Sequence, residues 1–119
     1  VITGTTARRI LIRGIGPGLA PQGVASPVGD PAVTLNHIGI GVIASNDNWQ
    51  TPATTVPSYP GVSGAEIAAA ATATGAFALA DGSKDAAILV TLAPGIYTAQ
   101  VSGVAGAGGA AMVEVYEVP

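Results

Sequence analysis

Three consecutive polar residues, Asn46, Asp47 and Asn48, form the clearest candidate for a metal site in this sequence. Carboxylate and amide oxygens suit Ca²⁺, which takes about six to eight oxygen ligands in a flexible geometry. The cluster holds one carboxylate, so a second would have to come from elsewhere in the chain. The alternative is an Asx turn, in which these side chains bond to their own backbone where a strand ends. The pattern favours the turn over a calcium site.

Carbohydrate contact is a second possible chemistry, carried by Trp49 and Tyr59, because exposed aromatic rings can stack on sugar faces. A lone Trp in a small β-domain more often anchors the core, and we favour that interpretation for Trp49. Thr54 and Thr55 lie in the Ser/Thr/Pro-rich stretch 51–60. This composition is typical of O-glycosylated stalks, although an unmodified surface loop is the simpler interpretation.

Catalytic chemistry has little support in the residue types. His37 is the single histidine and cysteine is absent, which excludes a zinc site built from His and Cys ligands. A Ser-His-Asp arrangement would need His37 beside Ser45 or Ser102 and a carboxylate. The Gly-x-Ser-x-Gly motif of a nucleophile elbow does not occur. We therefore interpret His37 as a turn residue, predict no catalytic residue and expect no enzyme.

Composition excludes further classes of function. The chain has 119 residues, of which 49% are hydrophobic, 4% aromatic and 9% charged, with a net charge of −3. A protein that follows nucleic-acid phosphates needs a basic surface, so a nucleic-acid partner is not expected. No apolar run approaches the roughly 20 residues of a membrane span. Low charge with abundant Thr, Gly and Ala is common in extracellular repeat and surface proteins.

The hydrophobic pattern predicts one domain over residues 1–119, built mainly from short strands separated by Gly and Pro. A helix is expected near 65–74, because Ser63 can cap its start and Gly75 can end it. The predicted strands cover residues 8–13, 33–38, 41–45, 86–92, 97–102 and 110–118. Strands of this length and spacing indicate an all-β fold, an antiparallel β-sandwich with jelly-roll or Greek-key-like connections.

Alternation along the strands also predicts which side chains point into the core. Ile10 and Ile12 are expected on one face of the first strand, and Arg13 on the other. In the second hairpin strand Val42 is expected to point inward. In the last strand, 110–118, the valines are expected inside and the polar residues outside.

Five segments taken together resemble a known module. They are 9–19 (RILIRGIGPGL), 30–35 (DPAVTL), 42–49 (VIASNDNW), 92–103 (LAPGIYTAQVSG) and 113–117 (VEVYE). In this order they resemble a repeat module of large bacterial secreted and surface proteins, similar to the bacterial pre-peptidase C-terminal domain, a β-sandwich. The resemblance implies an extracellular, non-catalytic module that often occurs in tandem.

The sequence departs from that pattern in two places. Such modules usually carry a further apolar strand before the position of Val1, and an Asp-Gly turn where this chain has 36–39 (NHIG). A sandwich short of one strand leaves an unpaired edge or an open groove, which can accept a strand from a neighbour. The residues expected to cross or line such a contact are Val1, Ile2, Thr3, Val113, Val115 and Val118.

These observations predict an extracellular structural module, either a tandem surface-protein repeat or the subunit of a self-assembling filament joined by strand-edge pairing. Its partners would be copies of itself or neighbouring repeats of the same kind. The alternative is a calcium- or carbohydrate-binding accessory domain of a secreted hydrolase, with a polysaccharide as partner. Ca²⁺ is the one cofactor that the residues suggest.

Overall fold

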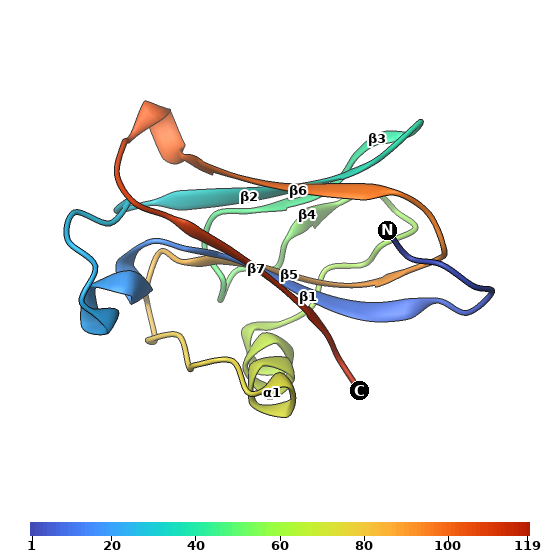
Figure 1. The fold of residues 1–119 in the computed structure, drawn as a ribbon, viewed down its shortest axis with the longest axis horizontal. Coiled ribbons are helices and arrows are strands. Elements are labelled where there is room, and N and C mark those ends of the chain that lie inside the picture. Colours follow the sequence, from blue (N-terminus) through green and yellow to red (C-terminus); the bar gives the residue numbers. More distant parts are fainter.

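The computed structural model describes residues 1–119 as two antiparallel β-sheets packed face to face, with one helix beneath the smaller sheet (Figure 1). The three-stranded sheet has the order β5-β1-β7 and the four-stranded sheet the order β4-β3-β2-β6. The all-β sandwich expected from the sequence is thus confirmed. In chain order the elements are β1 (Arg8–Ile15), η1 (Pro17–Gln22), β2 (Pro31–His37), β3 (Gly41–Asn46), β4 (Thr54–Thr55), α1 (Gly64–Thr74), β5 (Ala86–Leu92), β6 (Tyr97–Gly103), η2 (Val104–Gly106) and β7 (Met112–Glu117).

The core between the sheets follows the alternation predicted for β1 and β2. Ile10 and Ile12 point from β1 toward the other sheet, where Val33 and Leu35 of β2 meet them. The adjoining strand β5 adds Ile88, which lies opposite Ile12 in the antiparallel register. All these side chains are aliphatic, so the space between the sheets is filled almost without polar atoms.

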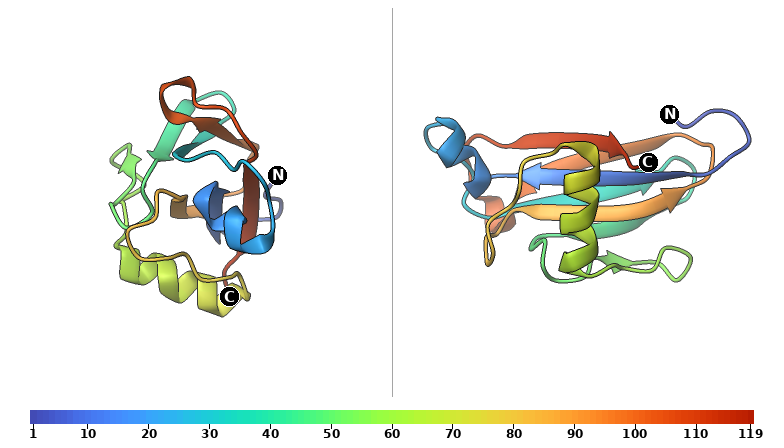
Figure 2. Two further views of the ribbon diagram at one scale, coloured as in Figure 1. Left: turned by 90° about the vertical axis from the view of Figure 1, so that its left-hand side faces the viewer. Right: turned by 90° about the horizontal axis from the view of Figure 1, so that it is seen from below.

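A second core lies on the outer face of the three-stranded sheet, where α1 packs across β1 and β5 (Figure 2). The helix begins at the predicted cap: the Ser63 hydroxyl accepts from the Glu66 amide, and the Glu66 carboxylate accepts from the Ser63 amide. It ends at Gly75, whose φ of 76° suits glycine. Leu11 is therefore buried under the helix, so β1 has cores on both faces.

The β2–β3 hairpin forms around Gly39 as expected, but the inward direction predicted for Val42 is wrong. The register shifts by one residue, because Leu35 pairs with Ala44 and Asn36 with Val42. Ile43 is the extra residue of this β-bulge, which reverses the alternation beyond it. As a result Ile43 and Ala44 are both buried, while Val42 is 55% exposed.

In the last strand Val113 and Val115 have the predicted inward direction, but the predicted burial is wrong. Val113 and Val115 share a face with Ile12, because Val115 pairs directly with Ile12 and Val113 with Gly14. They therefore point toward the other sheet, yet they are 48% and 60% exposed because that sheet does not cover them. The polar residue Glu114 is instead the more protected one, with a side chain 14% exposed.

Glu114 is protected because it faces Arg13, which the sequence analysis placed on the outer face and which is completely buried. The Arg13 Nε atom lies 2.9 Å from Glu114 Oε1. Arg13 Nη1 donates to the Phe77 carbonyl at 2.7 Å, and the guanidinium lies over the Phe77 ring. Tyr116 donates its hydroxyl proton to the other Glu114 oxygen at 2.7 Å. This ion pair ties the edge strand β7 to the centre of its sheet.

The turn after β1 is fixed by a buried carboxylate. Asp85 accepts hydrogen bonds from the amides of Gly16 and Gly18 at 2.7 and 3.1 Å, and from the Ser83 hydroxyl at 2.7 Å. A side chain at Gly16 would collide with the Val28 carbonyl. The Gly-Pro-Gly stretch is thus a structural turn, and β1 runs to Ile15 before it rather than ending at residue 13.

The two ion pairs of β7 give a matched test of this description. Replacing Glu114 with Ala leaves the buried Arg13 charge unpaired, so E114A should lower the free energy of unfolding by about 3–5 kcal/mol. Replacing Glu117 with Ala removes only its exposed pair with Arg8, so E117A should cost less than about 1 kcal/mol. Urea unfolding followed by circular dichroism measures both. Equal effects of the two substitutions would contradict the buried ion pair.

Candidate functional site

The two long sides of the sandwich end in very different ways. On one side the sheets end in β4, which has only two residues, and in β5, which is buried along nearly its whole length. On the other side they end in β6 and β7, of seven and six residues, which pair only with β2 and β1. Figure 1 shows these two strands in front. Edge strands are commonly protected from pairing with other chains by short length or by a covering segment. Here only the side of β4 and β5 has such protection.

The inward faces of β6 and β7 are incompletely covered. On β6 the inward residues Tyr97, Ala99 and Val101 pack against the core but remain partly exposed. On β7 the inward face carries the two exposed valines described above and, at its end, Glu117, which pairs with Ile10. Between the strands lies an open cavity of about 250 Å³, which we call the seam. It is lined by Val1, Ile2, Ile10, Ile12, Leu35, Leu92, Tyr97, Ala99 and Val115.

Part of the wall of the seam is formed by a short segment of the same chain that precedes β1. Residues 1–7, which we call the arm, precede β1 and fold back toward the turn between β5 and β6. Ile2 forms an isolated antiparallel bridge with Gly95, with N–O distances of 2.9 and 2.8 Å. Its side chain is half-buried against the core between the sheets. Two apolar residues of the arm, Val1 and Ile2, thus form part of the wall of this cavity.

Two tyrosines lie on the edge strands: Tyr97 lines the seam, whereas Tyr116 lies on the opposite face of β7, against the core under α1. The Tyr97 ring stacks on His37 with centroids 4.5 Å apart, and its hydroxyl donates to the Ala93 carbonyl. Burial raises the pKa of Tyr97, and Tyr59 nearby raises it further. The hydrogen bond to Glu114 raises the pKa of Tyr116, to which burial adds. Both phenols therefore stay protonated to a higher pH in the folded chain than in the unfolded chain.

The chemistry of the seam suits a polypeptide strand better than a small ligand. Its nine lining residues are all hydrophobic, whereas small-molecule sites combine apolar walls with a few placed polar groups in roughly 300–1,000 Å³. An apolar cavity of about 150 Å³ can hold a benzene ring. The larger seam therefore has room for the side chains of an added strand.

The residues predicted for an assembly contact are distributed unevenly. Val1, Ile2 and Val115 line the seam, and Val113 lies two residues along the same face of β7. Thr3 is exposed in the arm beside them. The prediction for Val118 is wrong: it is buried in the core under α1, because it shares the outer face of the strand with Glu114 and Tyr116. Five of the six residues thus lie at or beside one cavity, and Val118 does not.

The Asn46–Asn48 cluster does not form a single group of free oxygens. Asn46 is buried, and its amide nitrogen donates to the carbonyls of Asn48 and Thr51. Its side-chain oxygen accepts from the Ala87 amide at 3.0 Å, which links β3 to β5 across the sandwich. Asp47 is exposed and accepts from the Asn48 side chain. Asn46 thus has the role of an Asx-type anchor, and calcium binding stays a prediction.

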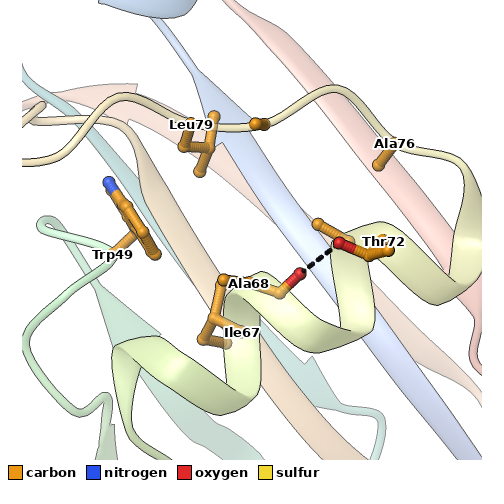
Figure 3. A pocket seen from close by; sticks show the side chains of 8 residues that line it. Trp49, Ile67, Ala68, Thr72, Ala76 and Leu79 are labelled. Carbon is orange, nitrogen blue, oxygen red and sulfur yellow. Dashed lines mark hydrogen bonds between the residues drawn. The ribbon is translucent and has the colours of Figure 1, made fainter.

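Trp49 is part of the core, which confirms the favoured interpretation. The alternative, an exposed Trp49 ring that stacks on sugars, is wrong. Its side chain is 5% exposed, and the indole nitrogen donates to the Ala80 carbonyl at 3.1 Å. Figure 3 shows the ring between Leu79 and Ile67. The pocket beside it measures about 110 Å³, well below the size of a typical ligand site.

Tyr59 and the two threonines lie apart from Trp49. Tyr59 packs against the core between the sheets, whereas Trp49 belongs to the core under α1, so the two rings share no exposed face. Thr54 and Thr55 form β4 and pair with Ser45 and Ala44 of β3. Thr54 is exposed on this short strand, so glycosylation there stays a prediction.

His37 is the last residue of β2 and also the first residue of the turn to β3, because its carbonyl accepts from the Ile40 amide at 2.9 Å. Within this sheet Ser45 lies opposite Thr34 and Ser102 opposite Ala32. At about 3.3 Å per residue, these positions are about 10 and 16 Å along β2 from His37. The imidazole and either hydroxyl are therefore too far apart for the hydrogen bond that a nucleophile and its base require.

Two features of the site were not predicted from the sequence. The first is the buried pair of Arg13 and Glu114, for which an Arg inside an apolar strand was the available signal. The second is the bridge from Ile2 to Gly95, which had no signal in the sequence. No group of three or more His, Cys, Asp or Glu side chains is placed to hold a metal ion. No helix has the length and apolar character needed to cross a membrane.

Comparison with protein-family models, curated proteins and solved structures found no match to this chain. The resemblance to the pre-peptidase C-terminal domain therefore stays a prediction.

The burial of Trp49 makes a direct prediction. Replacing Trp49 with Ala should lower the free energy of unfolding by about 3–5 kcal/mol, because it empties the space between α1 and the 76–79 segment. Chemical denaturation followed by circular dichroism measures this loss. A W49A chain as stable as the unmodified one would mean that the indole lies outside the core.

The tyrosine pKa values predict the alkaline behaviour. Both tyrosines have a raised pKa in the folded chain. The stabilisation that they contribute is therefore present below about pH 10, the pKa of an unfolded tyrosine, and is lost as the pH rises through the folded-state pKa values. Stability should therefore fall above pH 10, and the double variant Y97F/Y116F should fall less steeply. Thermal unfolding between pH 8 and 11 tests this, and identical slopes for the two proteins would contradict it.

Proposed function

We propose that this chain is a non-catalytic, extracellular structural module that joins neighbouring copies by strand pairing at the seam. In a tandem array the neighbour is the adjoining repeat, and in a filament it is a separate subunit. One observation carries the proposal: both sheets end on the same side in long strands with unpaired edges, and apolar residues of both strands are uncovered there.

The backbone of these strands supports an added strand. A free edge presents a row of unpaired N–H and C=O groups, which a neighbouring strand can satisfy. β6 contains no charged residue, and its outward side chains are the small or neutral Thr98, Gln100 and Ser102. Charged side chains, especially Lys, are a common protection against edge pairing. The edge of β6 carries no such protection.

The side chains of the seam add an apolar contribution. Complete burial of a valine side chain is worth about 1.5–3 kcal/mol, and Val113 and Val115 each have roughly half of that still to gain. Each backbone hydrogen bond to an added strand contributes a net amount of about 0.5–1.5 kcal/mol. A stable interface buries about 800 Å² per partner, so a neighbour has to cover the strands beside the seam as well as its cavity.

The extracellular location is supported by the low charge of the chain and by its resemblance to a module of secreted proteins. With 9% charged residues, the surface has few groups that oppose contact between copies. The non-catalytic part of the proposal is supported by the apolar lining of the seam.

A charge placed in the seam tests the proposal. The unmodified chain should grow in mass with concentration in light scattering, and electron microscopy should show elongated assemblies. The variant V115K should stay monomeric, because a lysine ammonium on the inward face of β7 opposes burial by a neighbour. The control V56K adds the same charge to an exposed valine beside β4, at the opposite edge, and should assemble normally. A monomeric unmodified chain, or V115K assembling as well as V56K, would contradict strand pairing at the seam.

A further inference from the structure

The arm is held to the rest of the chain by very few contacts. The two backbone bonds between Ile2 and Gly95 are the only hydrogen bonds that residues 1–7 make. Ile2 is half-buried, whereas the remaining arm residues are exposed, with Val1 at 84%. A segment attached through one bridge and one side chain can leave its place at small cost compared with unfolding of a strand.

The arm also has a suitable hinge. It reverses direction between Ile2 and Arg8 through bends at residues 4–6, where Gly4 has a φ of 87° and no atom within 4 Å of an added Cβ. Figure 2 shows this stretch looping outside the sheets before β1. Opening the hinge would extend the arm without moving a strand. Seven extended residues span roughly 23 Å, enough to reach a molecule packed beside β6 and β7.

The residues that surround Ile2 lie in the β-strands of the sandwich. The seat of Ile2 is formed by residues of β1, β2, β5, β6 and β7, among them Ile10, Tyr97 and Val115. Neither the arm nor the lining of the seam carries a charged side chain. A second copy presents the same seat, so an arm from a neighbour can make the same two backbone bonds and fill the same space.

We infer that the arm is exchanged between copies: Ile2 lines its own seam in the free chain and takes the same place in the seam of a second copy in the assembly. Exchange of an identical element is a low-cost route to association, because the arm makes in the neighbour the same bonds that it breaks in its own chain. The donor arm and the acceptor seam are different surfaces. Exchange in one direction therefore builds an open chain of copies. This inference rests on the proposed function: the arm fills the cavity through its bonds to Gly95, and the edges of β6 and β7 remain available to pair with other strands of the neighbour.

Two variants, each defective in one half of the exchange, test it. I2D cannot donate, because a carboxylate cannot enter the apolar seat, but the strand residues that form its own seat are unchanged. V115K cannot accept but keeps a normal arm. Each should be monomeric alone in sedimentation velocity, and an equimolar mixture should form a one-to-one complex. The control T5D adds the same charge to an exposed arm residue and should assemble like the unmodified chain.

Cysteine pairing then locates the arm. The chain has no cysteine, and directly bonded antiparallel residues have Cα atoms about 5.5 Å apart, within the range of a disulfide. When I2C and ¹⁵N-labelled G95C copies are mixed under oxidising conditions, mass spectrometry should show at least about tenfold more mixed disulfide than for T5C with G95C. Should G95C fold poorly, V115C replaces it, because Val115 lines the same cavity.

The outcomes separate this inference from the proposed function. If I2D assembles as well as T5D, or the mixed disulfide stays at the level of the T5C control while light scattering still shows assembly, the arm is not exchanged and another strand fills the seam. If I2D assembles better than the unmodified chain, Ile2 only blocks the seam, which also overturns exchange. If the unmodified chain does not assemble at all, both proposals fail.

Discussion

An antiparallel sheet must end in a strand whose outward amides and carbonyls have no partner, and both sheets of this chain leave such a strand on the same side. β6 and β7 point apolar side chains toward each other across the seam, and neither sheet is wide enough to cover them. On the opposite side the short β4 and the buried β5 close the sandwich. This asymmetry places the candidate site on the side of β6 and β7, where both sheets end in long strands with uncovered apolar residues.

The rest of the fold keeps that open side in place. β7 has a single neighbour in its sheet, and the buried contact of Glu114 with Arg13 holds it there. Just before β7 begins, the backbone of Ala110 forms hydrogen bonds with Ser26 and Val28, which fix the loop that joins β6 to β7. The core under α1 makes the three-stranded sheet rigid from below. An edge that is firmly held but unpaired is a suitable template for a strand from another molecule.

Local signals predicted the fold well because they act over a few residues. The Ser63 cap, the Gly75 stop and the alternation of Ile10 and Ile12 are each encoded within one element. The bulge at Ile43 was missed, because one inserted residue reverses the alternation without changing the composition. Val115 was correctly given its inward direction, but its exposure depends on the width of the opposing sheet. The burial of Arg13 depends on Glu114, far along the chain, which no local pattern reveals.

Hydrogen exchange of the backbone amides measures the state of the open edges most directly. In the dilute chain, the amides of β6 and β7 that do not bond to β2 or β1 should exchange rapidly. At concentrations where copies associate, these amides should become protected, while the amides of β5 should keep the same rates. Unchanged exchange along β6 and β7 in the associated protein would contradict pairing at the seam.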